Sequence, residues 1–216
     1  MKTDANICPG CGASSPLDSR FCGNCGTPTL LDSAGAIALW RLRAVRPAVL
    51  KGVRRVISRT LRLPVVVQPS FLDPRPSRRP GWNGASATAF LNQVDRRSRR
   101  GTVFSVGIPE ENIVPGAYWN YLFGYAYLGR PSCVVSLHRM SSDDPGMALL
   151  VERAAAIAIH EIGHNCGLDH HGYDEGIDCV MTADTPLDCL ERLDEGTHKF
   201  CRECRKAVDR KLRRGR

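Results

Sequence analysis

The sequence has no apolar run long enough to cross a membrane. A membrane helix needs about 20 consecutive apolar residues, and none of the 216 residues belongs to such a stretch. Residues 1–20 also lack the apolar segment of a secretory leader. We therefore expect a cytoplasmic protein, in a compartment where thiols stay reduced and disulfides are rare.

Acidic residues are missing from one long internal stretch, since no Asp or Glu lies between Asp32 and Asp73. Eight basic residues lie in the same stretch: Arg41, Arg43, Arg46, Lys51, Arg54, Arg55, Arg59 and Arg62. Apolar residues recur among them at roughly helical intervals, although Pro47 would break a single helix. We predict that residues 31–62 form a basic amphipathic linker or helix.

The excess of positive charge suggests a partner for part of this stretch. Residues 34–62 would suit an anionic partner, either a nucleic acid or a membrane surface. They would equally suit packing on the following domain, or a solvated linker with no partner. The whole chain has a net charge of +8, which is compatible with each of these interpretations.

Four of the 10 cysteines lie near the amino terminus as two Cys-x-x-Cys pairs: Cys8, Cys11, Cys22 and Cys25. A glycine follows each pair, as in zinc-ribbon knuckles, where backbone amides point at thiolate sulfur. The enclosed residues are too few for an apolar core, so metal binding and folding would be one event. We predict a zinc ribbon in residues 1–30.

A second pattern, HExxHxxGxxH, begins at His160. On a helix His160 and His164 project from one face, close enough to bind the same metal ion. Gly167 would end the helix at positive φ and bring His170 back as a third ligand. Three protein ligands leave a fourth position open for water, as in catalytic zinc sites. Glu161 would take a proton from that water. An amphipathic core helix with surface histidines is the competing interpretation.

The neighbouring sequence fits this motif. Residues 147–159 are mostly apolar helix formers, which predicts a buried helix ahead of the histidines. Cys179-Val180-Met181 follows at the distance expected for a methionine turn. Hydrophobic patterns predict strands near 65–68, 103–107 and 133–137, and a helix over 86–97.

These motifs resemble those of the archaemetzincins, zinc peptidases of the metzincin clan. The resemblance covers Pro64 to Cys204 and rests on HExxHxxGxxH, on Cys179-Val180-Met181, and on the pair Cys201 and Cys204. It implies an α+β fold over residues 63–216: a compact zincin domain with a mixed sheet packed on helices, preceded by the ribbon.

The resemblance also implies the roles of the site residues. The catalytic zinc would be held by His160, His164 and His170, with Glu161 as general base and Met181 in the methionine turn. A second, structural zinc would be held by Cys179, Cys201, Cys204 and a fourth ligand. Where the family has a cysteine after the third histidine, this chain has His171, followed by a longer loop. We expect His171 to be that fourth ligand, because Cys3His is an ordinary zinc set; Cys189 is the rival.

The predicted function is a zinc-dependent peptidase that hydrolyses peptide or protein substrates with a zinc-bound water and Glu161 as base. By the same resemblance, the strand at 133–137 would hold an extended substrate by edge pairing. The alternative is a zinc-dependent scaffold that binds nucleic acid or protein without turnover. Glu161 beside an open coordination position argues against that scaffold. A metallohydrolase of small amides or esters is also compatible with the motif.

Overall fold

The structure is a computed structural model, and it describes residues 6–7, 13–15, 24, 35–42, 45–71, 81–98, 102–141, 146–182, 194 and 198–214. Near the amino terminus β1 (Asn6–Ile7) pairs antiparallel with β2 (Ser14–Ser15). The four cysteines of the predicted zinc ribbon, Cys8, Cys11, Cys22 and Cys25, lie outside the described residues. The ribbon therefore stays a prediction.

A mixed five-stranded sheet forms the centre of the fold, as predicted. Its strands are β3 (Ala36–Leu42), β4 (Val65–Phe71), β6 (Thr102–Ile108), β8 (Gly124–Ala126) and β9 (Ser132–Val135). The spatial order is β4-β3-β6-β9-β8. The first four strands run parallel, and β8 pairs antiparallel with β9. A separate parallel pair joins β5 (Ala85–Ser86) to β7 (Ile113–Val114).

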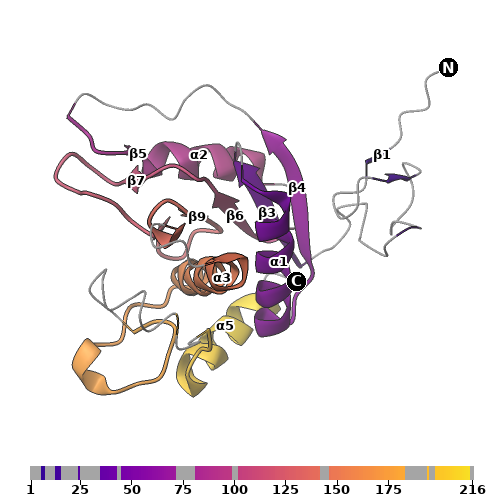
Figure 1. Ribbon diagram of the computed structural model, residues 1–216. Helices are drawn as coiled ribbons and strands as arrows, with labels where there is room; N and C mark the ends of the chain where they lie inside the picture. The colour runs from indigo at the N-terminus through magenta and orange to yellow at the C-terminus, as the bar shows by residue number, and fades with distance from the viewer. Residues whose placement is uncertain are drawn as a thin grey trace.

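Helices cover both faces of the sheet (Figure 1). The helices are α1 (Pro47–Leu61), α2 (Ala87–Arg97), α3 (Gly146–Asn165) and α5 (Arg202–Arg214), with short turns η1 (Arg139–Ser141) and η2 (Tyr173–Glu175). Alternate residues of β3 point to opposite layers, because side chains alternate along a strand. Ile37 and Leu39 join the core beneath α1 and α3, whereas Ala38 and Trp40 join the core beneath α2.

The stretch expected to be a linker is part of this domain. Residues 36–61 form β3, which pairs with both β4 and β6, and α1, which packs against α3. Val49, Val53 and Ile57 of α1 are fully buried. The domain therefore begins before residue 63. Residues 47–61 are helical, which is one of the two forms that the prediction allowed, but the strand β3 was not predicted, because a strand buried on both faces is an almost continuous apolar run. That run merges with the helical pattern beyond Pro47, which starts α1 rather than breaking it.

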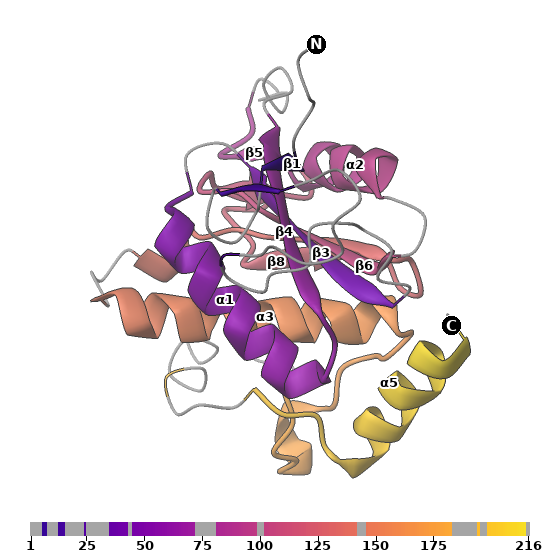
Figure 2. The ribbon, with the colours of Figure 1, turned by 90° about the vertical axis from the view of Figure 1, so that its right-hand side faces the viewer.

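The longest helix, α3, carries the predicted metal motif and crosses beneath the sheet (Figures 1 and 2). Most of its residues are buried, which explains why its sequence is apolar on nearly every side. Even so, every helix in the described part of the chain is too short or too polar to span a membrane.

Candidate metal centres

Three histidine rings converge at the carboxyl end of α3. His160 and His164 lie one helical turn apart, and the helix ends at Asn165. Gly167 has a φ of 87°, so the chain turns sharply there, as predicted. This turn brings His170 back to the helix, and each pair of Nε2 atoms among the three rings is 3.1 Å apart.

Backbone carbonyls fix the tautomer of two of these rings. The Nδ1–H of His160 donates to the Val180 carbonyl at 2.7 Å, and that of His164 donates to the Leu168 carbonyl at 2.8 Å. Both rings therefore present an Nε2 lone pair to the centre. Converging lone pairs repel one another unless a cation lies between them. A tetrahedral zinc, with Zn–N distances of ~2.0–2.1 Å, would place its nitrogen ligands ~3.3 Å apart, so the histidine trio fits zinc.

Glu161 lies beside the trio and against the sheet. Its side chain is buried, and this burial raises the pKa of its carboxyl group to about 8. A Cβ atom added to Gly124 of β8 would overlap the Glu161 carboxylate, so a larger residue there would displace it. The strand backbone thus passes directly over the expected general base.

Met181 forms part of the floor beneath the histidines. It is fully buried, and its Sδ atom lies against Gly163 of α3, where a Cβ would overlap it. The Met181 carbonyl also accepts the backbone N–H of His171 at 3.0 Å. Residues 179–181 therefore connect the loop after the trio to the helix that carries it.

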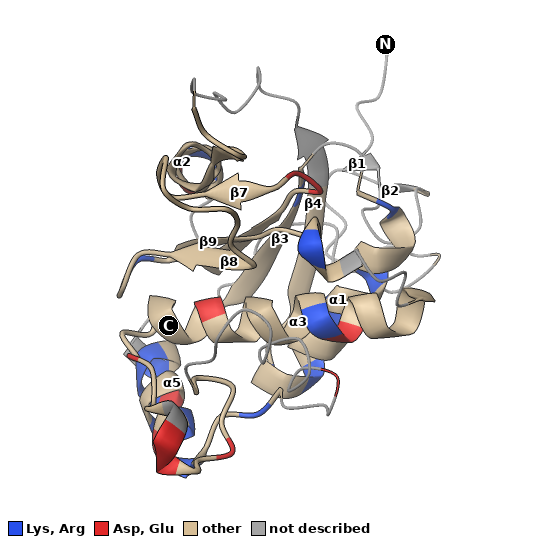
Figure 3. Ribbon diagram, turned by 60° about the vertical axis from the view of Figure 1, so that its left-hand side comes forward, with Lys and Arg blue, Asp and Glu red and all other residues tan. Residues whose placement is uncertain are grey.

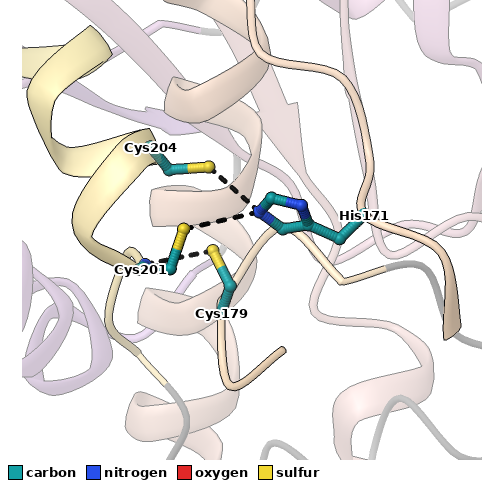
Figure 4. A group of neighbouring side chains, drawn as sticks. All are labelled: His171, Cys179, Cys201 and Cys204. Atoms are coloured by element: carbon teal, nitrogen blue, oxygen red, sulfur yellow. Dashed lines mark hydrogen bonds between the residues drawn. The ribbon is translucent and has the colours of Figure 1, made fainter. Parts of the chain in front are cut away.

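A second cluster lies where this loop meets the start of α5 (Figure 4). It contains His171, Cys179, Cys201 and Cys204, whose candidate ligand atoms all lie within 4.8 Å of one another. His171 Nε2 is 3.1 Å from Cys204 Sγ and 3.5 Å from Cys201 Sγ. These separations suit a tetrahedral zinc with Zn–S distances of ~2.3 Å, and three thiolates with one imidazole are a common structural set.

Backbone amides also point at the sulfur atoms. Cys179 Sγ accepts the N–H of Cys201 at 3.2 Å and that of Met181 at 3.5 Å. At Cys201, burial opposes ionisation, but hydrogen bonds from Cys204 and Glu203 outweigh it and lower the thiol pKa to about 7. Burial instead raises the pKa of Cys204 above its ordinary value. The cluster is thus a group of four candidate donors, of which Cys179 and Cys204 are buried.

The structure places His171, the expected fourth ligand, inside this cluster, while its rival Cys189 lies outside the described residues. Glu175 supports the ring from the longer loop, with its Oε2 3.8 Å from His171 Nδ1. The other carboxylate oxygen accepts the Gly172 N–H at 2.7 Å. Sequence reasoning missed both Glu175 and Gly124. No strand was predicted at residues 124–126, so the sequence offered no signal for the second.

The edge strand of the sheet differs from our expectation. Residues 132–135 form β9, which pairs with β6 on one side and β8 on the other, so β9 offers no free edge. Among the strands that the structure describes, β8 is the last on this side of the sheet, so its outer edge pairs with none of them. The sequence did not predict β8 as the edge strand, because its three residues are too few to show an alternating hydrophobic pattern.

Comparison with solved structures defines the fold. The structure of archaemetzincin from Methanopyrus kandleri superposes with a TM-score of 0.65 at 24% identity, covering 83% of this chain and 97% of that one. A zinc-dependent peptidase from Methanocorpusculum labreanum gives a TM-score of 0.67 at 21% identity, covering 80% of this chain and 99% of that one. The domain thus has the archaemetzincin fold.

Sequence comparison assigns the family. The profile of Peptidase family M54 matches residues 101–210. Archaemetzincin from Methanopyrus kandleri is 35% identical over 111 residues, which are 51% of this chain and 58% of that protein. Archaemetzincin from Thermococcus kodakarensis is 30% identical over 133 residues, covering 60% of this chain and 67% of that protein. The chain therefore belongs to peptidase family M54, and it spans about half the length of several of these relatives.

Proposed function

We propose that this protein is a zinc-dependent peptidase. The observation that carries the proposal is the convergence of His160, His164 and His170, whose Nε2 atoms are 3.1 Å apart. These three residues would hold the catalytic zinc. When bound, zinc would polarise a carbonyl group and make water more acidic. Membership of peptidase family M54 supports this function.

Glu161 performs the proton transfers in this proposal. It accepts a proton from the attacking water and passes it to the leaving amine, so one carboxylate serves both halves of the reaction. Its position favours this role, because the carboxylate lies between the metal-motif helix and the backbone of Gly124.

The free edge of β8 would hold the substrate. An extended peptide can add to such an edge through main-chain hydrogen bonds. Gly124 begins this strand and has no side chain to keep the substrate backbone away from Glu161. Peptides or proteins are therefore the proposed substrates, and β8 takes over the role that the sequence assigned to residues 133–137.

The second cluster would hold a structural zinc through His171, Cys179, Cys201 and Cys204. Four protein donors would leave no position for water, which distinguishes this site from the trio. The cluster would also help to position the first site. Val180, whose carbonyl accepts a hydrogen bond from His160, directly follows the cluster residue Cys179. The second zinc would thus hold the loop that aligns the first site.

The scaffold alternative is not favoured, because the family match and the three-donor site both point to turnover. Three further predictions belong to the same proposal: the zinc ribbon in residues 1–30, a cytoplasmic location, and an anionic partner for the basic segment.

Replacement of the expected general base tests the peptidase. Glu161→Gln should keep its zinc and lower turnover of a mixed peptide library by about a hundredfold to ten-thousandfold, the usual contribution of a general base. Glu152→Gln serves as the matched control, because Glu152 lies on the same helix but pairs with His198 at 2.8 Å. Turnover in this control should stay close to that of the unmodified protein. Retained turnover in Glu161→Gln would remove this carboxylate from its assigned role.

A further inference from the structure

One surface of the molecule is strongly basic and takes no part in the proposed hydrolysis. On α1 and at its carboxyl-terminal cap the exposed basic residues recur at near-constant spacing: Lys51, Arg55, Arg59 and Arg62. On α5 the same spacing recurs: Arg202, Lys206, Arg210 and Arg213. We call these eight residues the α1–α5 basic face. Residues four apart lie on one side of a helix, so each row forms a continuous stripe.

The two stripes belong to neighbouring helices. Arg205 of α5 donates through Nη1 to the Thr60 carbonyl of α1 at 2.7 Å. A cavity of about 260 Å³ lies at this junction, with Arg62, Arg205 and Arg213 in its lining. Asp209 also lines the cavity, and it pairs with Arg205 at 3.1 Å. Figure 2 shows α1 and α5 on the same side of the molecule.

Negative charge is scarce on this face. The sequence of α1, PAVLKGVRRVISRTL, contains no acidic residue; Figure 3 marks Lys and Arg in blue and Asp and Glu in red. On α5 only Glu203 and Asp209 are acidic, and Asp209 is already paired with Arg205. The stripes therefore form a positive surface that is complementary to a polyanion.

The apolar sides of both helices are unavailable to lipid. Val53 and Ile57 of α1, like Val208 of α5, are fully buried in the core. A helix that binds within a membrane surface must instead present its apolar side to the acyl chains. The burial of these side chains argues for an anionic partner that is contacted by charge alone.

Aromatic side chains are also absent from the stripes. The exposed large apolar residues of the described ranges lie on other segments: Tyr118, Trp119, Tyr127, Leu128 and Met147. Proteins that bind single strands stack the bases on aromatic rings, and neither stripe offers such a ring. Phosphates of a duplex need only the positive charges.

We propose that the α1–α5 basic face binds double-stranded nucleic acid through its phosphates, without reading the base sequence. The proposal goes beyond the peptidase function and does not depend on it. Neither α1 nor any residue of the face supplies a donor to the histidine trio.

The test measures binding of the full-length protein to a fluorescein-labelled duplex by anisotropy, from about 50 to 200 mM salt. The first variant carries Lys51→Gln, Arg55→Gln and Arg59→Gln together, and a second carries Arg202→Gln, Lys206→Gln and Arg210→Gln. The matched control, Arg96→Gln with Arg97→Gln and Arg130→Gln, removes the same net charge from α2 and the β8–β9 turn. Thermal melting checks that each variant is folded.

We expect each face variant to bind at least about tenfold more weakly at low salt, and its salt slope to be shallower by nearly three, about 0.9 for each lost phosphate contact. The control should change affinity less than about threefold. Equal weakening in the control would overturn the proposal, since net charge alone would then explain binding. So would undiminished binding in both folded face variants, or wild-type protein that prefers phosphatidylserine vesicles to the duplex.

Discussion

The histidine trio ends at His170 and the Cys3His cluster begins at the next residue, His171, yet the two sites differ in access and in number of donors. The trio offers three imidazoles at the end of a helix, and His170 is exposed. The cluster offers four donors, with Cys179 and Cys204 buried. Three donors with an open side suit hydrolysis, whereas four enclosed donors suit a structural metal. Two consecutive histidines thus belong to two clusters with different proposed roles.

Loss of a trio histidine should give the largest effect. His164→Ala removes one Nε2 from the three, and two imidazoles alone do not hold zinc firmly. We expect turnover to fall to background and the zinc content to drop by one per chain, measured by elemental analysis. A normal zinc count in a folded His164→Ala protein would contradict the assignment of the trio as a metal site.

Disruption of the Cys3His cluster should act mainly on stability. Cys204→Ser removes a buried thiolate, and metal binding at such sites is coupled to folding. We expect one zinc to be lost and the melting temperature to fall by about 10 °C. Cys166→Ser is the control, because Cys166 lies outside both clusters and burial raises its thiol pKa to about 12. Unchanged melting in Cys204→Ser would show that the cluster does not support the fold.

Gly124→Ala sharpens the comparison by changing reactivity without changing either set of donors. The added methyl group would displace the Glu161 carboxylate, and a shift of about 1 Å can cost a hundredfold in rate. We expect turnover to fall by about that factor with zinc content unchanged. Gly116→Ala is the control, since nothing lies within 4 Å of its added Cβ. Full activity in Gly124→Ala would mean that Glu161 is not held against β8.

Glu175→Gln should have the smallest effect, and only on the Cys3His cluster. Carboxylates that support a ligating histidine typically change metal affinity by about 10- to 100-fold when they are replaced. The 3.8 Å separation from His171 Nδ1 places Glu175 at the weak end of this range. Competition with a zinc chelator should therefore release the cluster's zinc about tenfold more readily. An equal effect on the trio would contradict the separation of the two sites.

The trio was predictable because its signal is local. Spacing along one helix places His160 and His164, and a glycine at positive φ brings back His170; both signals can be read from a few neighbouring residues. The strands at β4, β6 and β9 and the helix α2 were predicted for the same reason. His171 was placed from its position in a family pattern, and the structure brings it beside three cysteines.

The features that escaped prediction depend on contacts between distant segments. That β3 is a central strand follows from its pairing with β4 and β6, which are far away in sequence. The edge position of β8 and the contact of Gly124 with Glu161 likewise exist only once the sheet has formed. Strand order is set by such long-range pairing, and local hydrophobic patterns carry little information about it.

The most direct test of the contrast between the two sites is a crystal structure of the zinc-loaded protein, with anomalous scattering recorded at the zinc edge. We expect one peak amid His160, His164 and His170 with a non-protein fourth ligand, and another amid His171, Cys179, Cys201 and Cys204 with four protein ligands. An absent peak at the trio, or a fourth protein side chain closing it, would contradict the hydrolytic role.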